Sequence, residues 1–69
     1  MTPALRVATG IAIINELQDG GADIDAQHDI IYVGTSEAVE KMSDIMRVLM
    51  TETLGWHVDG ENQCWAIFV

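Results

Sequence analysis

The chain has 69 residues, of which 49% are hydrophobic, and its 11 acidic and 3 basic side chains give a net charge of −8. This length allows one domain with a thin core, and the apolar content is too high for a disordered chain. The charge argues against DNA, RNA and anionic lipid as direct partners, because their phosphates would be repelled. We therefore expect one α+β domain over residues 1–69 that meets a basic partner.

The expected location is the cytoplasm. The single cysteine, Cys64, cannot close an internal disulfide, which favours a reducing compartment. No apolar run approaches the roughly 18 to 20 residues that cross a bilayer. The first residues also lack the basic start and long apolar run of a signal peptide. We accordingly expect no membrane partner.

A first helix is predicted to begin at Thr2 and Pro3, a capping residue followed by a proline that the first turn tolerates. Its pattern ends at Gly20 and Gly21. One apolar stripe recurs at helical spacing and comprises Val7, Ile11, Ile14 and Leu17. The reverse side is also rather apolar, with Leu5, Thr9, Ala12 and Ile13. This reverse side is either scattered surface apolarity or a homodimer contact.

The next segment, Ala22 to Asp29, is rich in turn formers and charge and is predicted to be a loop or a frayed strand entry, with Ile24 anchoring it to the core. Residues 30–33, Ile-Ile-Tyr-Val, are β-branched and aromatic and are followed by Gly34. This composition predicts a strand.

A long helix of about five turns is predicted between Gly34 and Gly55. Ser36 is the expected N-cap, and Gly55 provides a left-handed stop. The expected core stripe is Val39, Met42, Ile45, Met46, Leu49 and Thr53, and the charged side is Glu37, Glu40, Lys41, Asp44 and Arg47. Three methionines, Met42, Met46 and Met50, suggest either core packing or an adaptable binding surface. Met50 lies off the stripe and is expected to be the most exposed of them.

The remaining residues predict a hairpin, with strands at residues 56–58 and 64–69 joined by a turn at residues 59–62. The last strand is the most apolar, so we place it in the middle of the sheet, antiparallel to both neighbours. The predicted fold class is α+β, in the order helix-strand-helix-strand-strand, with a three-stranded antiparallel sheet and two helices packed on one face. The other sheet face is only partly polar and is a possible partner surface.

Two groups of residues contain side chains that can bind a metal or take part in catalysis. Residues 23–29 hold three aspartates and His28, but they lack the glycine and the glutamate that a calcium loop requires at its sixth and twelfth positions. His57 and Cys64 lie on facing strands without a third group to orient the imidazole. We expect no enzyme, no metal and no cofactor, and an inert, buried Cys64.

The functional expectation rests on the carboxylates. Residues three or four apart on a helix lie about 5 to 6 Å from each other, which is close to the spacing of successive phosphates. Glu37, Glu40 and Asp44 would form such a row on the long helix. The preceding loop would add Asp23, Asp25 and Asp29, and a basic partner could bind this array as it binds a nucleic-acid backbone. The alternative is that the charge only maintains solubility.

Two stretches, AQHDIIYVG at residues 26–34 and LGWHVDGENQCWAIFV at residues 54–69, resemble small proteins encoded by bacteriophages and prophages. In size and charge the chain is similar to anti-CRISPR and anti-restriction DNA mimics. The resemblance implies an origin in a mobile element. From the net charge of −8 and the lack of a catalytic motif, we expect a non-enzymatic inhibitor in the host cell that binds a basic nucleic-acid-binding protein, such as a CRISPR effector subunit. A structural or homodimeric interaction module is the alternative, and a small enzyme or metal sensor the third possibility.

Overall fold

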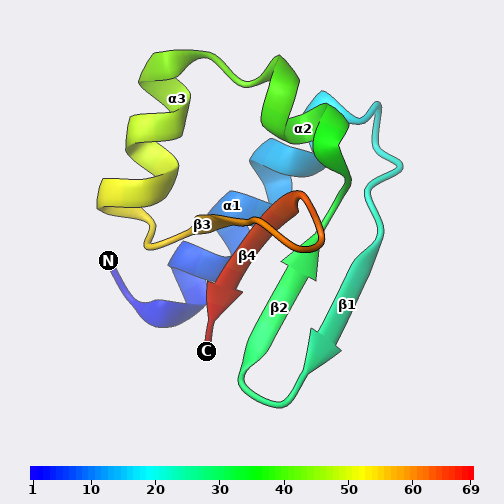
Figure 1. Cartoon of the computed structure of the whole chain (residues 1–69). Helices are drawn as coiled ribbons and strands as arrows, with labels where there is room; N and C mark the ends of the chain where they lie inside the picture. Colours follow the sequence, from blue (N-terminus) through cyan, green and yellow to red (C-terminus); the bar gives the residue numbers. More distant parts are fainter.

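A computed structural model describes the whole chain, from Met1 to Val69 (Figure 1). Three helices and one π-helical turn accompany a four-stranded antiparallel sheet. The elements are α1 (Pro3–Leu17), β1 (Ile24–Gln27), β2 (Ile30–Val33), α2 (Ser36–Lys41), α3 (Asp44–Val48), η1 (Leu49–Thr53), β3 (His57–Asp59) and β4 (Cys64–Phe68). The α+β class is therefore confirmed, whereas the three-stranded sheet with two helices is replaced by this larger set.

The first helix follows its sequence signals. The Thr2 hydroxyl accepts a hydrogen bond from the Leu5 N–H at 3.2 Å, and Pro3 occupies the first turn. At the other end, the Gly20 N–H donates to the Asn15 carbonyl at 2.8 Å with φ of 78° at Gly20. The first left-handed residue after α1 is Asp19, with φ of 54°, and its N–H donates to the Glu16 carbonyl at 3.3 Å, so that Asp19 and Gly20 together end the helix.

The sheet has the order β1-β2-β4-β3, and every neighbouring pair is antiparallel. The last strand is central, as its composition predicted, because β4 pairs with both β2 and β3. The prediction of a loop before β2 is wrong, since Ile24–Gln27 forms the edge strand β1. All four of its side chains are exposed, so the segment shows no apolar alternation that would predict a strand.

The predicted long helix is interrupted at Met42 and Ser43. Met42 has an extended backbone with ψ of 132°, and the Ser43 hydroxyl caps α3 by accepting from the Met46 N–H at 3.2 Å. Thr35, and not Ser36, caps α2, accepting from the Glu37 N–H at 3.3 Å. Gly55 has the predicted left-handed backbone, with φ of 78°.

The interruption changes which side chains are buried. Met50 and Leu54 are fully buried and Met46 is partly buried, whereas Ile45 is 85% exposed. The predicted exposure of Met50 and the predicted burial of Ile45 are therefore both wrong. A new helix begins at Ser43, so the apolar spacing restarts there and the stripe turns to a different side.

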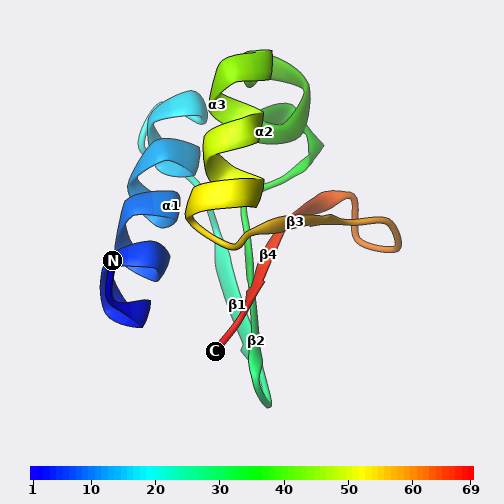
Figure 2. The same ribbon diagram turned by 90° about the vertical axis from the view of Figure 1, so that its left-hand side faces the viewer.

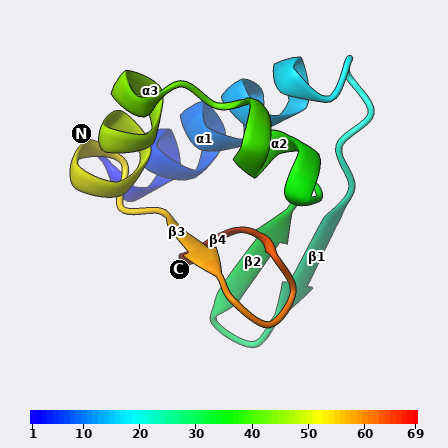
Figure 3. The same cartoon turned by 45° about the horizontal axis from the view of Figure 1, so that its top comes forward.

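The helices cover one face of the sheet, and the other face is open (Figures 2 and 3). The core between the layers contains Ile14, Val33, Ala38, Met42, Met50, Leu54, Trp56, Trp65 and Ile67. Alternation along the strands points Val33, Trp65 and Ile67 towards the helices. Tyr32, Ala66 and His57, which are paired across the strands, consequently lie on the open face.

Candidate functional site

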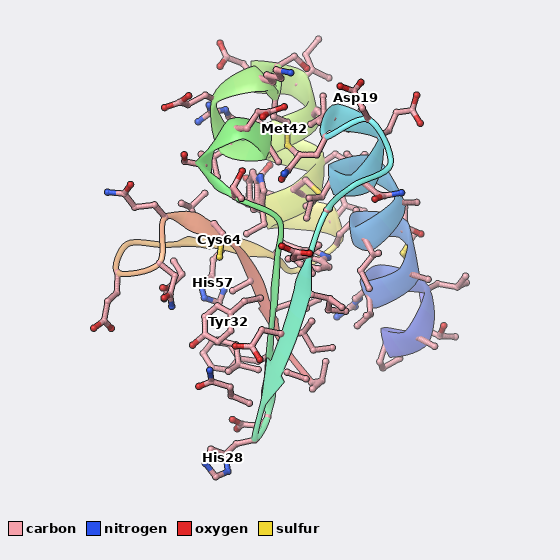
Figure 4. The ribbon with its side chains drawn as sticks, turned by 90° about the vertical axis from the view of Figure 1, so that its right-hand side faces the viewer. Asp19, His28, Tyr32, Met42, His57 and Cys64 are labelled. Atoms are coloured by element: carbon pink, nitrogen blue, oxygen red, sulfur yellow. The ribbon has the colours of Figure 1, made fainter.

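The six acidic residues predicted to bind a partner are all exposed, and they come from α2, α3 and the region of β1 and its turn. Glu37 and Glu40 belong to α2, whereas Asp44 begins α3 beyond the interruption, so they do not form a row on one helix. Asp29 lies in the turn beside His28, at the opposite end of the molecule from Met42 (Figure 4). Asp23 precedes β1, and Asp25 lies within it. The predicted row on one long helix is therefore not formed, whereas Asp23 lies near the start of α2, because its carbonyl accepts from the Gly34 N–H at 2.8 Å.

Most of the negative charge has no ionic partner. The structure contains one ion pair, in which the Lys41 Nζ lies 2.9 Å from the Glu37 Oε1. This hydrogen bond raises the pKa of Lys41, and the charge of Asp19 adds to the effect. Arg47 donates to the carbonyls of Met42 and Val39, and so serves the end of α2. Ten of the 11 carboxylate side chains thus remain outside any ion pair.

On the open sheet face, one of the predicted acidic residues lies beside a group of aromatic side chains. Asp25 on β1 lies opposite Tyr32 on β2, which lies opposite Ala66 on β4, which in turn lies opposite His57 on β3. In Figure 4, Tyr32, His57 and Cys64 appear on the same side of the sheet, away from α1. Residues from three distant parts of the sequence therefore meet on one surface.

His57 and Phe68 form a stacked pair on this face. Their ring centroids are 5.2 Å apart and their planes differ by 19°. Phe68 is 66% exposed, whereas Ala66 is fully buried even though it belongs to the open face. The larger neighbouring side chains therefore cover Ala66 and form the outer surface of the sheet.

Three carboxylates act on the phenol of Tyr32. Burial raises the pKa of Tyr32, and the negative charges of Asp59, Glu61, Cys64 and Asp25 raise it further, because they oppose formation of a phenolate. The Asp59 Oδ2 accepts from the Asn62 N–H and side-chain amide at 2.8 and 2.9 Å, so Asp59 also shapes the turn. Asp25 on the edge strand β1 and Glu61 in the turn between β3 and β4 are both exposed.

We call this surface the open-face site and define it by Tyr32, His57 and Phe68 with Asp25, Asp59 and Glu61. Sequence reasoning named Asp25 as a contact residue but assigned no role to the rings. The alternation of polar and apolar residues in β3 and β4 already suggested a partly polar sheet face. The pairing of Asp25 with Tyr32 could not be foreseen, because it requires β1.

The geometry gives Cys64 no feature of an activated nucleophile. Cys64 and His57 do lie on the same sheet face, since Cys64 pairs with Asp59 and His57 with Ala66. Cys64 is 5% exposed, and burial of its thiol together with the charge of Asp59 raises the pKa of the thiol. A raised pKa lowers the thiolate fraction, which is the reactive form. Elsewhere, the structure gathers no three side chains of the His, Cys, Asp and Glu types into a metal-binding group.

Two grooves flank α1. The larger, about 720 Å³, lies between the start of α1 and the end of β4, and Arg6 is its one charged lining residue. The smaller, about 560 Å³, lies between α1 and the α2–α3 junction, where Glu16 and Lys41 are the charged lining residues. Both grooves are lined mainly by hydrophobic side chains. No helix of the chain has the length and hydropathy of a membrane-spanning segment.

Comparison of the chain with models of protein families, with curated proteins and with solved structures finds no match in any of the three.

Proposed function

We propose that this chain is a non-enzymatic acidic inhibitor that binds a basic nucleic-acid-binding surface of another protein. The observation that carries the proposal is the excess of carboxylates without ionic partners, ten of 11, on a rigid scaffold. Such a surface attracts lysine and arginine side chains in the same way as a phosphate backbone does. The finer proposal is a DNA mimic of the anti-CRISPR or anti-restriction type, acting in the cytoplasm of a host cell on a protein such as a CRISPR effector subunit.

The open-face site is the surface that suits this role best. Protein interfaces commonly combine an aromatic centre with a polar rim, and the rings of Tyr32 and Phe68 with the carboxylates of Asp25 and Glu61 follow that pattern. The acidic residues of α2 are less suited to a central contact, because Glu37 is already paired with Lys41. We accordingly place the main contact on the sheet and a supporting one on the helices.

The test begins with capture of a partner from a host lysate on the immobilised protein, followed by measurement of its dissociation constant in increasing NaCl. Because ionic contacts are screened by salt, we expect the affinity to fall by about tenfold or more between 50 and 300 mM NaCl. An affinity that stays constant over this range would overturn the proposal.

Two variants that each remove two charges locate the contact. We expect Asp25→Asn with Glu61→Gln to weaken binding by about tenfold, since close charge pairs at an interface are worth about 1 kcal/mol or more. Glu40→Gln with Asp44→Asn is the matched control, because it makes the same change in net charge on the helices. A larger loss in the control pair would move the main contact to α2 and α3.

A second candidate function, a homodimeric module, has its own supporting observation. Ile45, Val48 and Leu49 are 85%, 53% and 37% exposed and lie three and four residues apart along α3 and the start of η1. Such a stripe is a possible contact between two copies. Sedimentation equilibrium at several concentrations separates the two functions: a dimer that dissociates in Ile45→Gln would support the second candidate, and a monomer throughout would remove it.

A further inference from the structure

The open-face site presents aromatic rings next to unopposed negative charge. Tyr32 and His57 are half-buried across Ala66, and Phe68 is stacked on His57 with most of its own surface exposed. One face of the Phe68 ring is therefore covered by His57, and the exposed remainder of Phe68 and the exposed part of Tyr32 are accessible to a partner. This arrangement is preorganised, because the strands fix the positions of the rings.

Charge on this side of the molecule is all of one sign. The carboxylates of Asp25, Asp59 and Glu61 act on the phenol of Tyr32. The three basic residues of the chain, Arg6, Lys41 and Arg47, all belong to helices, which lie on the other side of the sheet (Figure 2). A cation from a partner would thus meet no competing cation of this chain on the sheet face.

A ring face beside a carboxylate distinguishes arginine from lysine. The guanidinium group is planar and weakly hydrated, so that it stacks on an aromatic ring and still forms two parallel hydrogen bonds with a carboxylate. An ammonium group is a compact, strongly hydrated charge and gains less from the ring. We propose that the open-face site binds an arginine of the partner protein, with the guanidinium stacked on the rings of Tyr32 and Phe68 and paired with Asp25.

This inference rests on the proposed function and names the group that the acidic surface recognises. Asp25 is the carboxylate of choice because it lies directly opposite Tyr32 and is exposed. Its Oδ2 accepts from the Gln27 side-chain amide at 2.8 Å, which holds the carboxylate on the strand. Asp59 is less available, since its Oδ2 already accepts two hydrogen bonds from Asn62.

The test compares two synthetic peptides that differ only in having three arginines or three lysines, each titrated into ¹⁵N-labelled protein at 50 mM NaCl. We expect the arginine peptide to bind about three- to fivefold more tightly, which is the gain of an exposed cation–π contact. We also expect its largest amide shifts at Asp25, Tyr32 and Phe68. Equal affinities, shifts confined to α2 and α3, or no shifts at millimolar peptide would each overturn the inference.

Variants separate stacking from charge. Phe68→Ala removes one of the two stacking rings and should lower the preference for arginine to less than about twofold, while both peptides still bind because Tyr32 and all carboxylates remain. Asp25→Asn should weaken the binding of both peptides but retain some preference for arginine. Because Asp25 is exposed, this second variant tests the inference even if Phe68→Ala fails to fold. Loss of the arginine preference leaves the proposed function intact, since that proposal is tested separately by the salt dependence of the captured partner.

Discussion

Gly10 shows how one residue determines the packing of a helix in this fold. It is buried in the middle of α1, and the indole of Trp56 lies against the helix backbone at this point. The indole Nε1 donates to the Arg6 carbonyl at 2.9 Å, one turn earlier in α1. A Cβ at residue 10 would lie 2.6 Å from the Trp56 Cζ2 and nearer still to Cε2 and Nε1. The glycine therefore lowers helix propensity but provides the space that a fully packed tryptophan requires.

Gly10→Ala consequently tests packing against propensity. Propensity alone predicts a stabilisation of about 1 kcal/mol, whereas overpacking costs about 1–3 kcal/mol. We expect overpacking to outweigh propensity, so that the free energy of unfolding, measured in urea, falls by about 1–2 kcal/mol. In a Trp56→Leu background the same change should be neutral or stabilising, because the overlapping ring is gone. A stabilised single variant would show that the indole does not lie against Gly10.

Among the elements, the junction of α2 and α3 is a helix interruption at which side chains form hydrogen bonds with the backbone on both sides. The Ser43 hydroxyl binds the Met46 N–H at the start of α3, and the Arg47 guanidinium reaches back to the carbonyls of Met42 and Val39. Unpaired backbone groups at helix ends are costly when partly buried, so these two side chains stabilise a bend that propensity does not favour.

Ser43→Ala is expected to lower the free energy of unfolding by about 1 kcal/mol, the usual cost of losing an N-cap. Ser36→Ala is the matched control: Ser36 follows the true cap Thr35, so its replacement should change stability by less than about 0.5 kcal/mol. If the helix were continuous through residue 43, Ser43→Ala would instead raise stability, because alanine has the higher helix propensity. Urea denaturation of both variants measures the difference and its sign.

The sequence predicted those elements whose signals are local. Thr2 with Pro3 correctly marked the start of α1, and the apolar run at residues 64–68 correctly marked a central strand. The sequence analysis does not predict the break at Ser43, because it places Asp44 on the charged side of one continuous helix. Ser43 and Asp44 nevertheless resemble a cap followed by an acidic first turn. The strand β1 was missed because its stability comes from pairing with β2 and not from its own exposed side chains.

The residues of the candidate site also differ in whether local sequence or long-range strand pairing determines their positions. Asp25 could be identified as an acidic contact residue from composition, since any exposed carboxylate adds to the charge. Its position opposite Tyr32 depends on the pairing of β1 with β2, and the proximity of Phe68 depends on the pairing of β2 with β4. Long-range pairing of this kind leaves no local pattern in the chain, and so the rings had no predicted role.

For the whole molecule, the same charge has opposite consequences for folding and for binding. Ten carboxylates without ionic partners on a chain of 69 residues repel one another in the folded state. Salt screens this repulsion, with a Debye length of about 10 Å at 0.1 M that shortens to about 3 Å at 1 M. Salt also screens the attraction to a basic partner.

We therefore expect 500 mM NaCl to raise the free energy of unfolding by about 1 kcal/mol relative to 20 mM NaCl, as several like-charge contacts of a few tenths each are relieved. Urea denaturation at the two salt concentrations measures this change, and guanidinium chloride is unsuitable because it is itself a salt. Glu40→Gln with Asp44→Asn should reduce the gain, since it removes two of the repelling charges. Over the same range the affinity for the captured partner should fall. If NaCl instead lowered the free energy of unfolding, attractive ion pairs would dominate the surface. That outcome would contradict the expected repulsion among the unpaired carboxylates, which are also the groups that the proposed inhibitor offers to its partner.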